Sequence, residues 1–252
     1  MPPLSTQAIV LATFRYGETS KIVRLATESF GVQSAIAKGA MRPKSRFGAA
    51  LQVLSEGHAH LIIHGNRDLQ LLTAFDLLRI PVRLAESMER YAAAAALAEL
   101  MLRFAPADAH PESFQLLRQG LGALETVPEP DIESSGLKVM WGLVAGLGFA
   151  PEVDSCVRDG TPIGDGSLTF SYQEGGALCA TCARSEAAAT LAQRDRVDLM
   201  LLLDPAAPLP QLGPRQSAAH RRLLGRYIIH HLSEGTALPA LEFWLRRPWS
   251  AA

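Results

Sequence analysis

The residues best suited to chemistry form a short cationic segment in the first fifth of the chain. Two glycines and a proline keep this segment, residues 37–48, out of a helix and let its backbone approach a ligand closely. Each cation can contact one phosphate and release a condensed counterion. The segment therefore predicts a track for a nucleic-acid backbone, although a solvated basic loop without a partner has the same composition. Four cations lie within nine residues: Lys38, Arg42, Lys44 and Arg46.

A second constellation combines three cysteines with one aspartate. Cys156 and Asp159 are followed after 19 residues by Cys179 and Cys182. Two close ligand pairs at about this separation are typical of tetrahedral zinc sites, and a carboxylate can take the place of one thiolate. We therefore expect these four residues to hold one structural zinc ion. The alternative is a knuckle without metal, which leaves three reduced thiols around a hairpin.

Several histidines could replace Asp159 as the fourth ligand, but their spacing singles out none of them. His58 and His60 share one face of a predicted strand without a third ligand, so we interpret them as ordinary surface or core residues. The histidines that could substitute are His110, His220, His230 and His231.

Motifs of common enzymes are missing from the sequence. It contains no phosphate-binding G-x-x-x-x-G-K-[ST] loop, no G-x-S-x-G nucleophile elbow and no G-x-G-x-x-G turn after a strand. The zinc deaminase pattern is also absent. These absences favour a binding protein over an enzyme.

A basic helix is predicted over residues 214–233. Arg215, Arg222 and Arg226 share one of its faces, and Leu223 and Tyr227 share another. A basic rim beside an apolar patch suits an acidic peptide with an apolar end. It suits a membrane surface or simple solvation equally well.

Composition limits what kind of protein this is. Of its 252 residues 48% are hydrophobic and 19% charged, which is enough to build a core and excludes general disorder. No apolar run is long enough for a membrane span, and no secretory signal is visible. Three cysteines fit a reducing cytoplasm rather than a disulfide framework. The net charge is −1, yet residues 1–80 carry nine basic against five acidic side chains, as expected of a polyanion-binding surface.

The elements that must position these residues begin with five predicted strands, over residues 7–14, 21–27, 31–37, 51–63 and 69–75. Five short strands at this spacing predict a small antiparallel barrel, of the OB type or the SH3-like type. An OB barrel places Arg15, Lys21 and Arg24 near the same groove as the cationic segment. Tyr16 and Phe47 are candidates for stacking on bases, whereas Phe14 is expected in the core.

Helices are predicted after residue 80. Their ranges are 83–104, 112–126, 132–147, 185–203 and 214–233, with a hairpin near 167–172 inside an irregular cysteine-bearing segment. The tail, residues 241–249, carries three large aromatic residues expected to dock on the body. The fold class is therefore α+β, with a five-stranded OB-type β-barrel over residues 1–80. A helical domain over 81–252 follows and includes a zinc-ribbon-like knuckle at 151–183.

Residues 31–54 carry the most specific motif. Gly31 is followed by AKGAMR at 37–42 and by small residues that lead into LQV at 51–53. This stretch and the order of the parts resemble the RecO family of bacterial recombination mediators. Val53 departs from the family pattern, in which proline is frequent there. The resemblance covers nearly the whole chain, but in the C-terminal half it rests on architecture more than on motif.

The resemblance implies a DNA repair and recombination protein that binds single- and double-stranded DNA, anneals complementary strands and pairs with RecR in the RecFOR pathway. It further implies contact with the acidic C-terminal tail of single-strand-binding protein and indirect action on RecA, in the cytoplasm at the nucleoid and without a membrane. The DNA contacts would be Arg15, Lys21, Arg24, Lys38, Arg42, Lys44 and Arg46, and the tail contacts Arg215, Arg222 and Arg226. An RNA- or ribosome-associated OB/zinc-ribbon protein and a zinc enzyme remain as alternatives.

Overall fold

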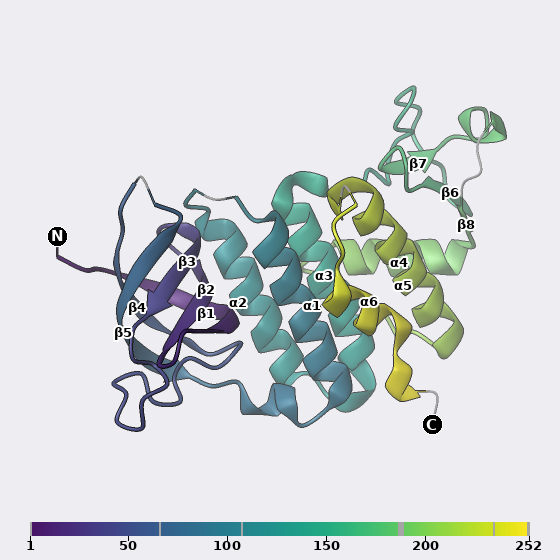
Figure 1. Ribbon diagram of the computed structural model, residues 1–252. Helices are drawn as coiled ribbons and strands as arrows, with labels where there is room; N and C mark the ends of the chain where they lie inside the picture. Colours follow the sequence, from purple (N-terminus) through teal and green to yellow (C-terminus); the bar gives the residue numbers. More distant parts are fainter. Residues whose placement is uncertain (1, 66, 107, 186–188, 234, 251–252) are drawn as a thin grey trace.

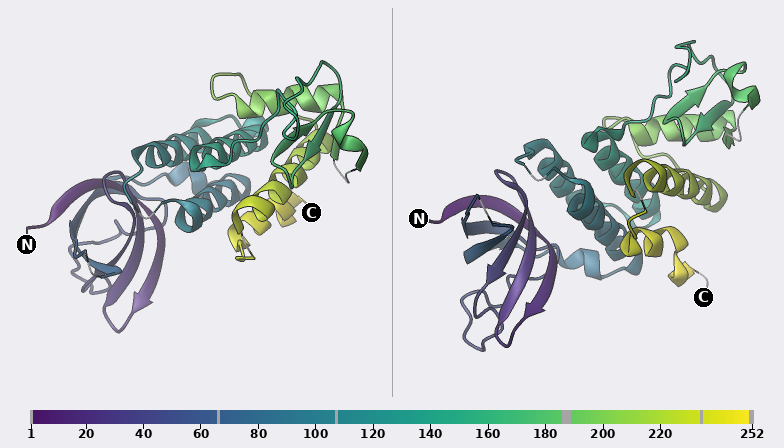
Figure 2. Two further views of the ribbon diagram at one scale, coloured as in Figure 1. Left: turned by 90° about the horizontal axis from the view of Figure 1, so that it is seen from above. Right: turned by 45° about the horizontal axis from the view of Figure 1, so that its top comes forward.

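The computed structural model describes residues 2–65, 67–106, 108–185, 189–233 and 235–250. An N-terminal barrel lies against a bundle of helices, and a small sheet-bearing knuckle projects from the bundle (Figure 1). Figure 2 shows from two further directions that the barrel and the knuckle lie at opposite ends of the bundle. Within the described residues, no helix combines the length and the apolar character needed to cross a bilayer.

The barrel is closed, with strand order β1-β2-β3-β5-β4. β3 pairs with β5 in parallel, and the other neighbours are antiparallel, including β1 with β4. This is the OB arrangement, so the OB-type prediction is confirmed and the SH3-like alternative is not. The strands are β1 (Leu4–Tyr16), β2 (Ser20–Thr27), β3 (Gly31–Ala37), β4 (Glu56–Ile62) and β5 (Leu69–Arg79).

Alternation along the strands divides the apolar residues between two cores, because successive side chains point to opposite faces of a strand. Val10 and Leu25 line the barrel's own core. Ile9, Leu11 and Ala26 point the other way and join the core of the helical bundle. The barrel is therefore buried against the helices through its own outer face.

A bulge bends β4 where the sequence places a glycine. The β4–β5 register shifts between Glu56 and Gly57. A Cβ on Gly57 would lie 2.5 Å from the Asp76 carbonyl oxygen and 2.6 Å from the Phe75 ring. Only glycine fits this close approach without displacing the neighbouring strand.

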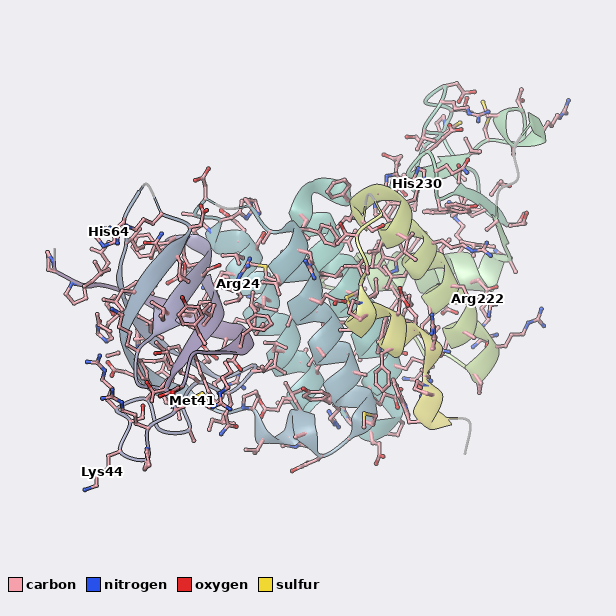
Figure 3. The ribbon with its side chains drawn as sticks, in the orientation of Figure 1. Arg24, Met41, Lys44, His64, Arg222 and His230 are labelled. Atoms are coloured by element: carbon pink, nitrogen blue, oxygen red, sulfur yellow. The ribbon has the colours of Figure 1, made fainter. Side chains whose placement is uncertain are left out.

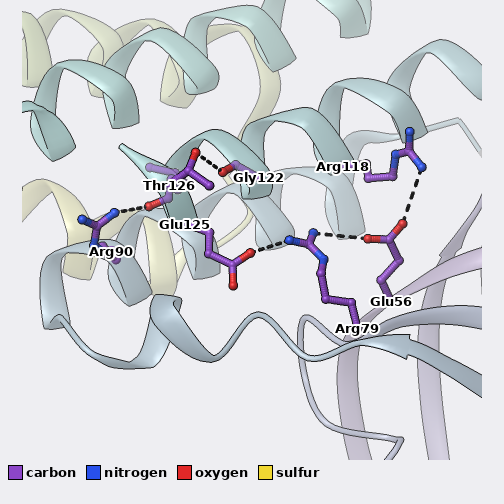
Figure 4. Close-up of polar contacts among 8 residues, drawn as sticks. Glu56, Arg79, Arg90, Arg118, Gly122, Glu125 and Thr126 are labelled. Atoms are coloured by element: carbon purple, nitrogen blue, oxygen red, sulfur yellow. Dashed lines mark hydrogen bonds and ion pairs between the residues drawn. The ribbon is translucent and has the colours of Figure 1, made fainter. Parts of the chain in front are cut away.

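An ion-pair network crosses from the barrel to the helices (Figure 4). At the end of β5, Arg79 Nη2 lies 3.2 Å from Glu56 Oε2, and Arg79 Nη1 donates to Glu125 Oε2. Arg118 Nη1 lies 3.7 Å from the other Glu56 oxygen. Because both glutamates are largely buried, each depends on its arginine partner for compensation of its charge.

Six α-helices of the described residues build most of the remainder. The alanine-rich α1 packs against α2, α3 and α6, because its small buried side chains let the helices approach closely. A 3-10 turn, Val82–Ala85, precedes α1. The first predicted helix, residues 83–104, therefore starts later than expected. The helices are α1 (Met88–Phe104), α2 (Pro111–Thr126), α3 (Ile132–Val144), α4 (Gln193–Leu203), α5 (Pro214–Ile228) and α6 (Pro239–Arg246).

Two of these helices end in π-helical turns, Ala145–Phe149 after α3 and Ile229–Ser233 after α5. Gly148, which follows the third predicted helix at residues 132–147, has a φ of 93°, which favours glycine. Further 3-10 turns are Glu129–Asp131, Cys182–Ser185 and Pro248–Ser250.

The aromatic tail docks on the helical core through Trp244, which is buried, and through Trp249, which is partly buried. Trp244 on α6 is buried, and its ring lies 3.3 Å from the position that a Cβ on Gly136 would occupy. Phe243 is exposed and lies 5.3 Å from Trp249 between ring centroids. The expected docking is therefore confirmed for Trp244 and Trp249. The helix α6 itself was not predicted.

The knuckle contains a three-stranded sheet of order β7-β6-β8, formed by β6 (Leu168–Ser171), β7 (Gly176–Leu178) and β8 (Ala189–Leu191). The predicted hairpin is confirmed as β6 paired with β7. The predicted helix over 185–203 is wrong in its first part, because β8 pairs with β6 and overrides the helix propensity of alanine. Residues 186–188 of that prediction lie outside the described residues.

Candidate nucleic-acid interface and metal centre

The cationic loop after β3 folds in tight turns onto one end of the barrel. The Met41 N–H donates to the Thr19 carbonyl at 2.8 Å, which ties the loop to the β1–β2 turn. Phe47 is 2% exposed and, with Ala40, fills the barrel core. Apolar residues thus anchor the loop, and Lys44 projects away from the barrel (Figure 3). The exposed cations are Lys38, Arg42, Lys44 and Arg46.

Strand register brings further cations to this end. Arg15 stands directly opposite Lys21, and Lys21 stands opposite Ala37, the residue before Lys38. Like charges that face each other across strands repel, unless an anion lies between them. Among the ion pairs of the described residues, none involves Arg15, Lys21, Lys38 or the other loop cations. This barrel end therefore presents cations that form no ion pair with an acidic side chain among the described residues.

Arg24 lies apart from the other predicted contacts. Side chains alternate along β2, so Arg24 and Lys21 lie on opposite faces of the strand. Arg24 shares its face with Ala26, which packs into the helical core. Figure 3 shows Arg24 on the side of the barrel that faces α2. The structure thus brings six of the seven predicted DNA contacts to one barrel end and places Arg24 elsewhere.

Two aromatic residues differ from expectation. Phe47, a predicted stacking residue, is buried, whereas Phe14, predicted in the core, is 55% exposed. The register shift between Val10 and Ala12 lets the last residues of β1 extend past the core. Phe14 and Tyr16 therefore flank Arg15 as exposed rings. In the sequence, only its position next to Arg15 indicated that Phe14 could be an exposed stacking residue.

The predicted metal ligands converge in the knuckle. The ligand atoms of Cys156, Asp159, Cys179 and Cys182 all lie within 4.8 Å of one another. Asp159 Oδ2 lies 3.4 Å from the sulfur of Cys179 and 3.4 Å from that of Cys182. Asp159 thus takes the fourth position that a cysteine occupies in a four-thiolate site.

Hydrogen bonds and burial shift the pKa values of these residues in different directions. The Thr161 N–H, followed by the Cys156 thiol, holds the pKa of Asp159 well below its usual range. Burial would raise the pKa of Cys156, but N–H groups of residues 179, 158 and 159 lower it below its ordinary value. Burial and the neighbouring thiols raise the pKa of Cys182 to about 12.

This donor set fits zinc, because three sulfurs and one ionised carboxylate are ligands that zinc accepts in a closed tetrahedral site. A zinc ion held there would supply a structural cross-link between the two turns that carry the ligands. The proton on Cys182 would be displaced, since a coordinated sulfur binds as thiolate.

The histidines considered as replacement ligands are engaged elsewhere or lie in another cluster. His110 Nδ1 accepts from the Ser113 N–H at the start of α2. His60 pairs with Asp76 at 2.7 Å, which agrees with its interpretation as an ordinary residue. His231 Nε2 lies 2.7 Å from the Tyr172 carbonyl oxygen. His220 belongs to a separate group on α4 and α5.

A cavity of about 450 Å³ opens between α5, β8 and the start of α4. The Arg226 guanidinium lies 5.8 Å from the centre of the Tyr172 ring, and Arg222 extends outward (Figure 3). Arg221 of the same helix turns inward and pairs with Glu133, so it does not contribute to this rim. The lining includes Arg215, Arg222 and Arg226 with Leu191 and Leu223. We call it the arginine cavity.

Together these features define a class: an OB-barrel protein with a cation-rich barrel end, a helical bundle and an inserted knuckle that could bind a metal. Comparison with known families agrees. The family model described as "Recombination protein O N terminal" matches residues 1–81, and "Recombination protein O C terminal" matches residues 85–238. The chain belongs to the RecO family of DNA repair proteins.

Individual relatives match most of the chain, two of the three below over nearly its whole length. The DNA repair protein RecO of Anaeromyxobacter sp. (strain K) is 32% identical over 253 aligned positions, which cover 96% of both chains. That of Rubrobacter xylanophilus is 35% identical over 185 positions, 72% of both chains. That of Desulfatibacillum aliphaticivorans is 28% identical over 246 positions, covering 93% of this chain and 94% of the relative.

Proposed function

We propose that this protein is a non-catalytic mediator that binds single- and double-stranded DNA by its phosphates and anneals complementary strands. The observation that carries the proposal is the barrel end, where Arg15 faces Lys21 beside four exposed loop cations without an acidic partner among the described residues. Such a surface lowers its own electrostatic free energy when a polyanion binds. Membership of a DNA repair family favours DNA as that polyanion.

The chemistry of annealing requires no bond to be made or broken. Cations that hold two backbones reduce the repulsion between them and leave their bases free to pair. The exposed rings of Phe14 and Tyr16 would add stacking on unpaired bases. Arg24, on the α2 side of the barrel, would contact only a strand that continues along that face.

For partners, we propose that the protein pairs with RecR and helps load RecA onto strands covered by single-strand-binding protein. The arginine cavity is the proposed site for that protein's acidic tail. Its rim of Arg215, Arg222 and Arg226 would pair with carboxylates, and Leu191 and Leu223 would contact an apolar end. The zinc proposed for the knuckle would be structural.

The test is a salt titration of oligonucleotide binding to the full chain. Replacing Lys38, Arg42, Lys44 and Arg46 by alanine should weaken binding to all sequences alike and reduce the log–log salt slope by up to ~0.7 per lost single-strand contact. Annealing of complementary DNA strands, measured alongside, should slow in the same variant, and parallel titrations with RNA strands distinguish an RNA-binding role.

A control variant loses equal charge outside the barrel, at four exposed arginines of the helices and knuckle. It should keep the wild-type slope. An unchanged slope in the loop variant would remove the loop from the DNA site, and stronger binding to RNA than to DNA would favour the ribosomal alternative. The control positions are Arg83, Arg103, Arg184 and Arg246.

A further inference from the structure

A second polar cluster lies in the helical bundle, away from the cysteines. Asp195 and Asp198 stand three residues apart on one face of α4, and His220 comes from α5, which packs against it. One ligand atom from each residue lies within 4.8 Å of the other two. These residues belong neither to the cationic loop nor to the cysteine cluster of the knuckle.

The cluster is buried yet lacks hydrogen-bond partners. His220 is 0% exposed and Asp198 is 7% exposed. Both ring nitrogens of His220 and Oδ2 of Asp198 have no partner among the described residues. Leaving a buried polar group unpaired is unfavourable by about 1–3 kcal/mol, and more for a charged group. Buried groups of this kind are normally satisfied by protein, ordered water or an ion.

Three considerations favour an ion over water. The donor set of one imidazole and two carboxylates is one that zinc and manganese accept in proteins. The three donor atoms lie within 4.8 Å of one another, close to the separation of ligands that each lie about 2.0–2.2 Å from a shared ion. Two carboxylates beside an imidazole also leave net negative charge, which water does not neutralise.

We propose that Asp195, Asp198 and His220 form a second metal site, which takes a divalent ion of the zinc or manganese type and joins α4 to α5. Asp195 also lines the arginine cavity, so the ion is reached from solvent through that opening. Three protein ligands leave a further coordination position for water or for a small anion in the cavity.

The electrostatics agree with this assignment. Burial raises the pKa of Asp198, against the opposing effects of His220 and Arg194. Burial lowers the pKa of His220, against the opposing effects of Asp198 and Asp195. A cation between the two residues stabilises the ionised carboxylate and neutral imidazole together.

The site is tested by titrating the EDTA-treated full chain with Mn²⁺ and measuring the free ion by electron paramagnetic resonance. Mn²⁺ is chosen because thiolates are poor ligands for it, which leaves the cysteine cluster silent. We expect one Mn²⁺ to bind and to be displaced by Zn²⁺. Asp195→Asn and Asp198→Asn should each weaken binding by at least about 10-fold. The matched control, Cys179→Ser with Cys182→Ser, should leave it unchanged.

Thermal unfolding supplies an independent readout. Mn²⁺ should raise the Tm of the wild type and leave that of Asp195→Asn unchanged. Asp195 is only half-buried, so this variant keeps the test available if Asp198→Asn fails to fold. The proposal is overturned if the wild type binds no Mn²⁺ at millimolar concentration. It is also overturned if Asp198→Asn lowers the Tm in EDTA while Mn²⁺ has no effect, because that result indicates a direct ion pair with His220.

Discussion

Asp159 shows how one residue can alter the ligand chemistry of a motif while the motif keeps its shape. The carboxylate lies 3.4 Å from two cysteine sulfurs and accepts from the Thr161 N–H at 3.0 Å. It therefore occupies the position of a fourth ligand in a turn that its own hydrogen bonds support. A carboxylate oxygen is a harder donor than a thiolate, so we expect a zinc site that is weaker than one with four sulfurs.

This comparison predicts the effect of two substitutions on zinc affinity. Asp159→Cys should tighten zinc binding by at least about 10-fold, and Asp159→Ala should weaken it by a similar factor, because a soft ligand is gained or a ligand is lost. Competition with a chromophoric chelator measures both affinities. Asp154→Ala removes an exposed acid from the same segment and should have no effect. Equal affinities in the wild type and Asp159→Ala would exclude Asp159 from coordination.

At single residues, the sequence was a good guide to charge and a poor guide to burial. The clustering of four knuckle residues that could hold a metal and of six cations could be predicted, because spacing and charge are local properties. Phe14 and Phe47 exchanged their expected environments, because burial depends on where β1 passes its bulge and on how the loop folds back. The bulge at Gly57 depends on how closely β5 approaches, since no other residue type tolerates the contact with Asp76 and Phe75.

Elements were predicted well wherever their own periodicity decides their structure. All five barrel strands and the helices α1, α2, α3 and α5 overlap the ranges that the pattern predicts, but residues 51–55 of the fourth predicted strand lie outside β4 and the first predicted helix begins only at Met88. The first part of residues 185–203 was assigned to a helix, because its alanines favour one locally, whereas pairing with β6 imposes a strand. The π-helical turns have no sequence signature that pattern analysis uses.

The π-helical turn after α5 predicts a pH dependence. His231 Nε2 lies 2.7 Å from the Tyr172 carbonyl oxygen and so links this turn to the residue after β6. Burial lowers the pKa of His231 below its ordinary value, although this hydrogen bond opposes the shift. A lowered folded-state pKa means that the stabilisation is present above the unfolded value of about 6.5 and is lost as the pH falls through the folded value.

We therefore expect the Tm of the wild type to fall more steeply between about pH 7 and pH 5 than that of His231→Gln, which keeps a donor but does not titrate. Circular dichroism melts over this range measure the difference. His64→Gln, on the barrel loop at the other end of the molecule (Figure 3), is the control and should follow the wild type. Parallel curves for the wild type and His231→Gln would contradict the prediction.

For the whole molecule, the order of parts could be predicted from the sequence, but the way they join could not. A change in texture near residue 80 separates strands from helices. The junction depends on which residues the outer face of the barrel presents, namely Ile9, Leu11 and Ala26, and on Arg79 lying between two buried glutamates. Those contacts connect positions far apart in the chain, which local patterns do not reveal.

The junction predicts a single cooperative unfolding transition. All three tryptophans lie in the helical part, so their fluorescence follows that part in urea, while hydrogen exchange of β2 amides follows the barrel. In the wild type both should report the same midpoint. Arg79→Met leaves the buried carboxylate of Glu125 without its arginine partner and leaves Glu56 only the longer contact to Arg118. It should reduce stability by about 2–4 kcal/mol, near the lower end for buried pairs because Arg79 is partly exposed.

Arg79→Met should also separate the two midpoints, with the barrel exchanging first. Adding Glu56→Gln and Glu125→Gln to this variant removes both buried negative charges and should recover part of the loss. Arg83→Met, which lies just beyond the junction on the surface, is the control. Separate midpoints already in the wild type would show that the two parts unfold independently.

The shared core also bears on how the molecule can be dissected. Cutting the chain after β5 would remove the helices that cover Ile9, Leu11 and Ala26, and would leave an exposed hydrophobic patch on the isolated barrel. Proteins with such an exposed patch tend to aggregate and to bind other hydrophobic surfaces. Aggregation of the isolated barrel would interfere with a DNA-binding measurement. Substitutions in the intact chain are therefore the better way to locate the DNA-binding site.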